Sequence, residues 1–341
     1  MAHELEASPS QLRSPLHLGT PNSRRLLRLR RMSEVRARAK AMENDVADVL
    51  IVDNPDEPHA QRILRAVRDE GHRAMRFNLT DLRAGRFHSD VCSVSLENEC
   101  GRLAITERTK VWWRHGGSVD VSGLDPEEAT LATDEGPYLL AGAILASGAE
   151  LVDCPYAIYR AELKPFQLAV ARRLGIPTPV TRITNDPKAA RSFVSDQRSV
   201  AKPLSPGQGI APFVAEVTRD DVAHVQSLPT MLQELIVSEA DARVVVVGSQ
   251  AWVWKRTREG HTIDWRAVDR SGDGFIAIAD EVLGQLAVKM CVGLGLTTSV
   301  QDWLYSVDQP VFLESNAVGA WLFLRDSERL VVPALVRHLV H

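Results

Sequence analysis

Short apolar runs alternate with amphipathic stretches from about residue 46 to the end of the chain, and this alternation predicts a mixed α/β fold. Residues 49–52 are a wholly apolar run typical of a buried strand, and residues 57–70 carry a helical pattern that stops at Gly71. A second strand follows at residues 72–77. Together these elements predict a β-α-β unit at the start of the folded part.

The rest of the first half predicts a small domain, residues 46–155, built around that unit. Its other expected elements are a hairpin of residues 91–97 and 103–110, a strand at 111–114, a helix at 126–146 and a strand at 150–153. The preceding residues 1–45 are polar and arginine-rich with little apolar periodicity. They predict a disordered basic extension, with an arm that binds nucleic acid or a membrane as the alternative.

The second half predicts a larger domain, residues 156–341, with a central part at about 178–230 and a carboxyl-terminal part at about 231–341. Its expected helices lie at residues 161–174, 186–195, 279–294 and 331–340. Its expected strands lie at residues 180–184, 200–204, 213–217 and 232–237, and in two hairpins over 243–258 and 297–316.

The composition is that of an ordinary globular protein and narrows the classes of partner. Of the 341 residues, 45% are hydrophobic and 25% are charged, and the formal net charge is -4. This charge predicts neither nucleic acid nor a membrane as a partner, and no apolar run approaches the ~20 residues of a membrane span. Four scattered cysteines and the lack of a signal-peptide core predict reduced thiols in a cytoplasmic protein.

Three oxygen-bearing side chains gather in the last predicted hairpin. Asp302 lies in its first strand, and Glu314 and Asn316 lie two residues apart in the second, so that both point to the same face. Two carboxylates and an amide are the hard oxygen ligands that Mg²⁺ prefers. The hairpin therefore predicts a metal site, with a solvated hairpin carrying scattered polar residues as the alternative.

Two lysines are candidates for contacts with phosphate. Lys202 lies at the end of an apolar strand beside the loop 205–209, whose two glycines let backbone amides approach an anion. Lys164 lies in the first turns of a predicted helix, where the helix dipole also favours an anion. Lysines that simply reach solvent are the plainer interpretation of both.

A strand end followed by two carboxylates is a candidate nucleoside site. Gln233, Glu234, Leu235 and Ile236 end a predicted strand whose backbone can face an adenine edge, and the carboxylates that follow can accept hydrogen bonds from ribose. An exposed acidic turn is the alternative.

Two arginines complete the set of candidates. Arg243 and Arg266 carry planar forks suited to phosphate or carboxylate, or are surface charges. No GxSxG, HExxH or convincing Cys/His pair is present, so nucleophilic catalysis is not predicted.

The order of these parts resembles the ATP-grasp superfamily, in which two α+β subdomains close on ATP. Within it the chain is similar to the ribosomal-peptide maturases that make graspetides (the microviridin-type ligases), a group related to the ribosomal-protein glutamate ligases. The segments that carry the resemblance are 161–168, 201–204, 233–234, 241–248, 263–266, 302–303 and 312–321. Upstream, residues 54–58, 71–73 and 112–114 look like the pre-ATP-grasp domain of those maturases.

The resemblance implies an α/β (α+β) ATP-grasp fold behind an N-terminal pre-ATP-grasp domain, with ATP and Mg²⁺, or alternatively Mn²⁺, as cofactors. It assigns Lys164 and Lys202 to the ATP phosphates. It assigns residues 233–236 to the adenine, and Glu239 or Asp241 to the ribose.

The same resemblance assigns Asp302, Glu314 and Asn316 to one or two Mg²⁺ ions. It assigns Arg243 and Arg266 to the γ-phosphate and to the acyl phosphate formed from it. The chain departs from the family pattern at Asn78, at His115-Gly116 and at Ala317, and these departures leave the details of peptide recognition open.

The implied activity is that of an ATP- and Mg²⁺-dependent ligase that activates a carboxylate as an acyl phosphate, which a hydroxyl or an amine then attacks. The implied substrate is a ribosomally made precursor peptide, which is macrocyclised through side-chain ester or amide bonds under a lid formed by residues 205–209. The alternatives are a ligase that adds amino acids to a carboxylate, as the glutamate ligases do, and a catalytically silent ATP-binding module. The resemblance also suggests a homodimer.

Overall fold

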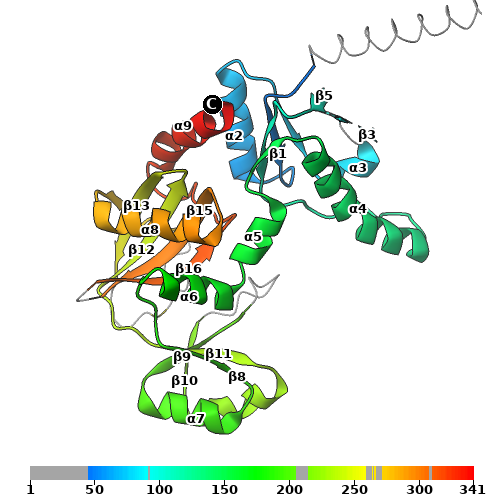
Figure 1. Cartoon of the computed structure of the whole chain (residues 1–341). Helices are drawn as coiled ribbons and strands as arrows, with labels where there is room; N and C mark the ends of the chain where they lie inside the picture. The colour runs from blue at the N-terminus through cyan, green and yellow to red at the C-terminus, as the bar shows by residue number, and fades with distance from the viewer. Residues whose placement is uncertain are drawn as a thin grey trace, which may run out of the picture. The chain divides into compact units, whose positions relative to one another are not determined.

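The computed structural model describes residues 45–90, 93–204, 214–258, 263, 265, 271–306 and 309–341. The chain divides into two compact units, Met1–Asp45 and Val46–His341. The predicted basic extension lies outside the described residues except for Asp45. All elements described below belong to the second unit, and many of them are labelled in Figure 1.

A four-stranded parallel sheet confirms the predicted β-α-β opening. Its strands, in the order β2-β1-β6-β7, are β1 (Val49–Val52), β2 (Ala74–Phe77), β6 (Lys110–Trp113) and β7 (Glu150–Val152). Helix α2 (Pro58–Asp69) joins β1 to β2, and α4 (Pro126–Ala146) precedes β7. Every residue of β1 and β2 is buried, as is typical of parallel strands with both faces covered.

A small antiparallel sheet, in the order β3-β4-β5, is formed within residues 86–105, between β2 and β6 in the sequence. Strands β4 (Val94–Asn98) and β5 (Gly101–Ile105) form the predicted hairpin. Strand β3 (Arg86–Ser89) and the short helix α3 (Asp81–Ala84) are not among the predicted elements. The sequence of β3 alternates between exposed and half-buried residues and so lacks the apolar signal of a strand.

The helix predicted over residues 161–174 is α6 (Lys164–Arg173), and a separate helix that was not predicted, α5 (Pro155–Ala161), precedes it. Pro165 has no backbone N–H to donate to the carbonyl of Ala161, so a continuous helix would leave that carbonyl unpaired. The side chain of Gln167 supplies a donor instead, with Nε2 2.7 Å from the Ala161 oxygen. The break leaves Lys164 as the first residue of α6.

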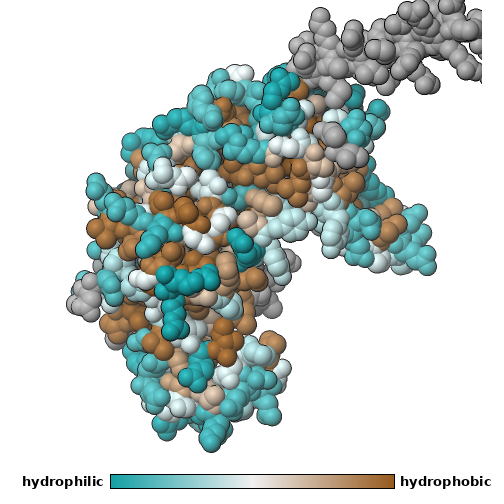
Figure 2. Space-filling model, in the orientation of Figure 1, coloured by the Kyte–Doolittle hydropathy of each residue, from teal (hydrophilic) through white to brown (hydrophobic). Residues whose placement is uncertain are grey.

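The central sheet is antiparallel and is covered by helices on one face. Its strands, in the order β10-β9-β11-β8, are β8 (Thr181–Thr184), β9 (Ser199–Lys202), β10 (Ala215–Val217) and β11 (Thr230–Glu234). Helix α7 (Pro187–Asp196), capped by Asp186, and the short 3-10 helix η1 (Asp221–Ser227) pack against Leu232 and Ala201. In Figure 1, α7 lies on the side of this sheet away from α6, and Figure 2 shows a mainly hydrophilic surface there.

The carboxyl-terminal sheet is antiparallel and carries a helix on each face. Its strands, in the order β14-β13-β12-β15-β16, are β12 (Ala240–Val247), β13 (Gln250–Thr257), β14 (Ile276–Ile278), β15 (Thr298–Tyr305) and β16 (Pro310–Asn316). Both predicted hairpins are confirmed, whereas β14 is an additional strand. Helix α8 (Glu281–Leu294) packs on one face, and α9 (Ser327–Val340), which begins earlier than predicted, packs on the other.

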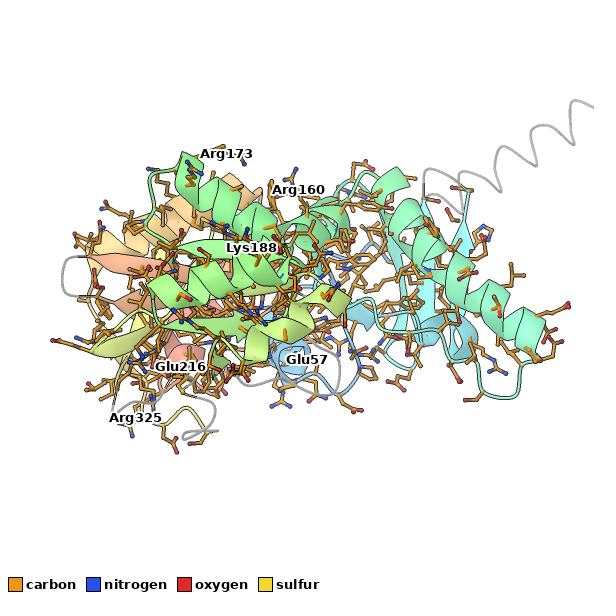
Figure 3. The ribbon with its side chains drawn as sticks, turned by 90° about the horizontal axis from the view of Figure 1, so that it is seen from below. Glu57, Arg160, Arg173, Lys188, Glu216 and Arg325 are labelled. Carbon is orange, nitrogen blue, oxygen red and sulfur yellow. The ribbon has the colours of Figure 1, made fainter. Side chains whose placement is uncertain are left out.

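Arg160 joins α5 to α6 and to α8, and Arg173 adds a second cation over the same ring within α6. Figure 3 labels Arg160 on α5 and Arg173 on α6, and both guanidinium groups lie over the ring of Phe166, 5.5 and 6.0 Å from its centroid. Arg160 also donates to the carbonyl of Leu294 at the end of α8, where a cation complements the helix dipole. Among the helices that the structure describes, none is long and apolar enough to cross a membrane.

Candidate active site

Asp302 on β15 and Glu314 on β16 are direct cross-strand partners in the confirmed hairpin. A register shift follows Asp302 at Trp303. Asn316 pairs with Val300, two residues before Asp302. Because directly opposed residues project to the same side of a sheet, all three candidate metal ligands lie on one face.

On β12, the same face changes from apolar to charged along the strand. Val245 and Val247 on β12 belong to the cluster that packs against α9, whereas Asp241 and Arg243 on the same face are charged. Arg243 is the cross-strand partner of Asp302, so it adds a cation beside the two carboxylates. The opposite face of β12, which packs against α8, is apolar throughout this region.

Two cations offset the repulsion between the paired carboxylates. Like charges directly opposite each other destabilise a sheet. In this structure Arg243 Nη1 lies 2.7 Å from Asp302 Oδ1, and Lys164 Nζ lies 3.2 Å from Glu314 Oε2. A divalent cation would supply the same compensation for the two carboxylates.

Lys164 also links this hairpin to the central sheet. Its Nζ donates to the carbonyl oxygen of Pro203 at 3.0 Å, directly after Lys202 at the end of β9. Lys202 pairs with Met231 on β11. Since Ala201 packs against α7, Lys202 projects from the other face of the sheet. The two candidate phosphate lysines are therefore brought close together in space from segments far apart in the sequence.

Gln233 shares that open face of the central sheet and carries an unused acceptor. It pairs with Val200, two positions along the ladder from the pair formed by Met231 and Lys202 and therefore on the same face. Its Nε2 donates to Thr181 Oγ1 at 2.9 Å, but its buried Oε1 has no hydrogen-bond partner among the described residues. An exocyclic amino group such as that of adenine is a donor that would satisfy it.

The residues after Gln233 form the connection between two sheets. β11 ends at Glu234, earlier than predicted, and the half-buried Leu235 and Ile236 lead toward β12. The backbone N–H of Glu234 donates to Val180 O, and that of Leu235 donates to Arg198 O. The predicted adenine segment 233–236 therefore lies at the junction of the central and carboxyl-terminal sheets.

The two candidate ribose carboxylates differ in their surroundings. Glu239 is exposed, whereas Asp241 is buried. The carboxylate of Asp241 accepts hydrogen bonds from Arg258 Nε and Nη2 at 3.0 and 2.6 Å, and it lies 3.5 Å from Arg256. Arg266 and the predicted lid 205–209 lie outside the described residues.

Glu162 and Gln167 are site residues to which the sequence alone assigned no role. Burial raises the pKa of Glu162, against a hydrogen bond from the backbone N–H of Ala317, and the nearby carboxylate of Glu314 raises it further. Gln167 contacts the backbone of Ser315, between the two ligand candidates of β16. The sequence signal for both is their position around Pro165, which breaks the helix beside the site.

The candidate metal ligands form only part of a coordination shell. Within the described ranges, no cluster of three or more His, Cys, Asp or Glu side chains suited to a metal is found. Two carboxylates and the amide of Asn316 leave several coordination positions to other oxygens. Such a partial set fits Mg²⁺, which usually keeps waters and substrate phosphates as ligands, better than Zn²⁺.

Comparison with solved structures identifies the fold. An ATP-grasp ligase associated with ribosomal peptides from Chryseobacterium gregarium, in complex with ADP and a leader and core peptide, matches with a TM-score of 0.77 and 20% identity, over 85% of this chain and 96% of that one. The macrocyclase MdnC of Microcystis aeruginosa, bound to precursor peptide MdnA, matches with a TM-score of 0.73 and 20% identity, over 86% and 98%. The ligase PsnB with a minimal precursor, Mg and ADP matches with a TM-score of 0.68 and 21% identity, over 86% and 99%.

A RimK domain ATP-grasp protein from Sphaerobacter thermophilus is less similar, with a TM-score of 0.55 and 17% identity over 86% of this chain and 98% of that one. No family model matches the sequence, and no curated protein matches it. The chain thus has the ATP-grasp fold expected from the sequence, and its structural neighbours include peptide-modifying ATP-grasp ligases and a RimK domain protein.

Proposed function

We propose that this protein is an ATP- and Mg²⁺-dependent ligase that activates a carboxylate as an acyl phosphate and couples it to a hydroxyl or an amine. The observation that carries the proposal is the facing pair Asp302 and Glu314, with Asn316 on the same face and Lys164 and Arg243 in contact with the pair. Two carboxylates, an amide and two cations on an ATP-grasp fold support a site for a divalent cation and an anion.

The nucleotide would lie between the central and carboxyl-terminal sheets. Lys164 and Lys202 would hold its phosphates as point charges. The segment 233–236 would contact the adenine, and the unused acceptor of Gln233 supports this placement. Glu239 or Asp241 would bind the ribose. Asp302, Glu314 and Asn316 would hold the metal.

Each residue has a physical task in the proposed reaction. A bound Mg²⁺ supplies positive charge that neutralises phosphate oxygens. Arg243, together with Arg266, would steady the phosphoryl group as the carboxylate oxygen attacks it and ADP leaves. A hydroxyl or amine then attacks the acyl carbon, so that an ester or amide bond forms and phosphate departs. Residues 205–209 would exclude water from the acyl phosphate intermediate.

We further propose a ribosomally made precursor peptide as the substrate, with its Asp or Glu side chains activated and macrocyclised. The solved structures that contain a leader and core peptide or a precursor peptide support this substrate class. They leave open whether esters or amides form. We also propose that the protein acts in the cytoplasm as a homodimer. Light scattering of the full chain would test the dimer.

Mass spectrometry of the peptide product tests the proposal. The full chain is incubated with ATP, Mg²⁺ and synthetic candidate peptides whose cores are rich in Thr, Ser, Lys, Asp and Glu. Macrocyclisation predicts products lighter by one water per ring. A gain in mass would instead identify a ligase that adds amino acids, for which the RimK domain match is the supporting observation. An unchanged mass with folded protein would contradict both.

A further inference from the structure

A buried histidine of the N-terminal part holds the loop of residues 317–322, which directly follows β16. His59 Nε2 lies 3.0 Å from the backbone nitrogen of Trp321 and 3.1 Å from that of Leu322. A ring nitrogen that faces two N–H groups is an acceptor, so the proton of neutral His59 lies on Nδ1. Nδ1 donates to Glu57 Oε1 at 2.6 Å, and His59 is only 3% exposed.

Arg114, at the end of β6, extends the same network to the loop. Its Nε donates to Asp53 Oδ2 at 2.8 Å, and its Nη2 donates to the carbonyl oxygen of Val318 at 3.1 Å. The same Nη2 lies 3.4 Å from Glu57 Oε1. Asp53 and Arg114 are both buried, and removing one partner of a buried ion pair leaves an uncompensated charge. The network therefore attaches the loop firmly to the parallel sheet β2-β1-β6-β7, which we call the N-terminal sheet.

The candidate site holds the loop from the other side. Arg243, which contacts Asp302, also donates to the carbonyl oxygen of Ala320 through Nε at 3.2 Å and Nη2 at 2.8 Å. The side chain that contacts a candidate metal ligand thus shares the loop with His59 and Arg114. Three backbone segments that are distant in sequence meet at this loop.

We infer that His59 is a positioning residue: with Arg114 it holds the 317–322 loop and thereby fixes Arg243 and Asn316 relative to the N-terminal sheet. The sequence predictions gave His59 no role. Its effect on the loop is independent of any reaction, whereas its effect on turnover rests on the proposed function. Protonation of Nε2 would turn the acceptor into a donor that faces two N–H groups, and would release the loop.

Hydrogen–deuterium exchange of the ligand-free full chain tests this inference. His59→Met removes the acceptor and keeps an apolar side chain of similar length. Amides in a peptide that spans residues 317–324 are expected to exchange at least about tenfold faster. His59→Gln keeps an acceptor near the position of Nε2 and is expected to retain most of the protection. His72→Met is the matched control, since His72 is half-buried on the same domain and pairs with Asp48 instead.

Three results would overturn the inference. The first is unchanged exchange of the 317–324 peptide in His59→Met. The second is an equal increase across the whole chain, and the third is an equal loss of protection in His59→Gln, because neither of these depends on an acceptor at the loop. If His59→Met does not fold, the wild type is compared at about pH 7.5 and at the lowest pH at which the rest of the chain keeps its protection, with rates corrected for intrinsic exchange. Because burial lowers the pKa of His59, the loop is expected to lose its protection only at the acid end of this range. Loop protection that falls only together with that of the whole chain would then overturn the inference.

The Mg²⁺ requirement of ATP turnover is a second measurement, which a purely structural role of His59 would leave unchanged. On the proposed function, His59→Met raises the Mg²⁺ concentration for half-maximal ATP turnover about tenfold, and His59→Gln restores it. If the exchange results are as expected but the wild type has no ligase activity, only the proposed function is contradicted. Faster loop exchange in His59→Met with an unaltered Mg²⁺ requirement would show that the loop does not position the site.

Discussion

Gln167 on α6 forms a two-point hydrogen-bond pair with the backbone of Ser315 on β16. Its Oε1 accepts from the Ser315 N–H at 2.9 Å, and its Nε2 donates to the Ser315 carbonyl at 2.7 Å. β16 is the edge strand of its sheet, so these backbone groups have no neighbouring strand to pair with. The side chain of Gln167 therefore acts as a one-residue strand partner between Glu314 and Asn316.

Replacement of Gln167 by leucine is expected to loosen the metal hairpin. The change keeps the volume but leaves buried backbone groups of Ser315 unpaired, which costs about 2 kcal/mol of unfolding free energy. We expect ATP turnover to fall about tenfold because the ligand orientation on β16 is lost. Chemical denaturation and steady-state kinetics measure the two effects. Gln250→Leu, at an exposed position of β13, is the matched control and should change stability by less than about 0.5 kcal/mol.

Arg243→Lys is expected to separate binding from turnover. A lysine can keep one contact with Asp302 but cannot also reach the Ala320 carbonyl through two further N–H groups. We expect kcat for ATP turnover to fall about 100-fold with little change in nucleotide affinity, since the lost interaction acts on developing charge. Kinetics and nucleotide titration measure this split. Arg172→Lys on the exposed side of α6 is the control and should change neither quantity. If kcat and nucleotide affinity fall equally in Arg243→Lys, the assigned role is contradicted.

The stability of the protein is expected to fall in two acid steps that involve the His59 network. Burial lowers the pKa of His59 below 6.5, so the unfolded state binds more protons and stability decreases as pH falls below about 6.5. Burial alone would raise the pKa of Glu57, but the hydrogen bond from His59 and the charge of Arg114 lower it to about 2. Its contribution is present above pH 4.5 and is lost between 4.5 and about 2.

Urea unfolding as a function of pH checks this assignment. His115 and His338, whose pKa values are also lowered by burial, contribute to the upper step. His59→Gln should therefore reduce, and not abolish, the dependence of stability on pH just below 6.5. Identical slopes for the wild type and His59→Gln would contradict a neutral, buried His59.

The carboxyl-terminal hairpin could be predicted because its signals are local. Two apolar runs with a turn between them predict an antiparallel pair, and the spacing of Glu314 and Asn316 predicts a shared face. The structure confirms the pairing of β15 with β16. The β-α-β opening follows in the same way from local patterns, and so does the helix over residues 126–146, although it contains Pro137 in its interior.

The contacts that hold the site could not be predicted, because they join residues far apart in the sequence. Gln167 and Ser315 are separated by 148 positions, and His59 and Trp321 by 262. The break between α5 and α6 depends on whether another donor reaches the Ala161 carbonyl, which a local pattern does not reveal. Only the tertiary fold brings Lys164 to Glu314.

The central claim is that Asp302, Glu314 and Asn316 hold the metal that binds with the nucleotide, and calorimetric titration of ADP with and without Mg²⁺ tests it most directly. For the wild type we predict that Mg²⁺ strengthens ADP binding at least about tenfold, and that the double variant Asp302→Asn, Glu314→Gln loses this enhancement while metal-free ADP still binds. The control Asp134→Asn, Glu135→Gln removes the same charge from the exposed surface of α4 and should keep the enhancement. An enhancement by Mg²⁺ that is the same in the wild type and in the hairpin variant would contradict the account.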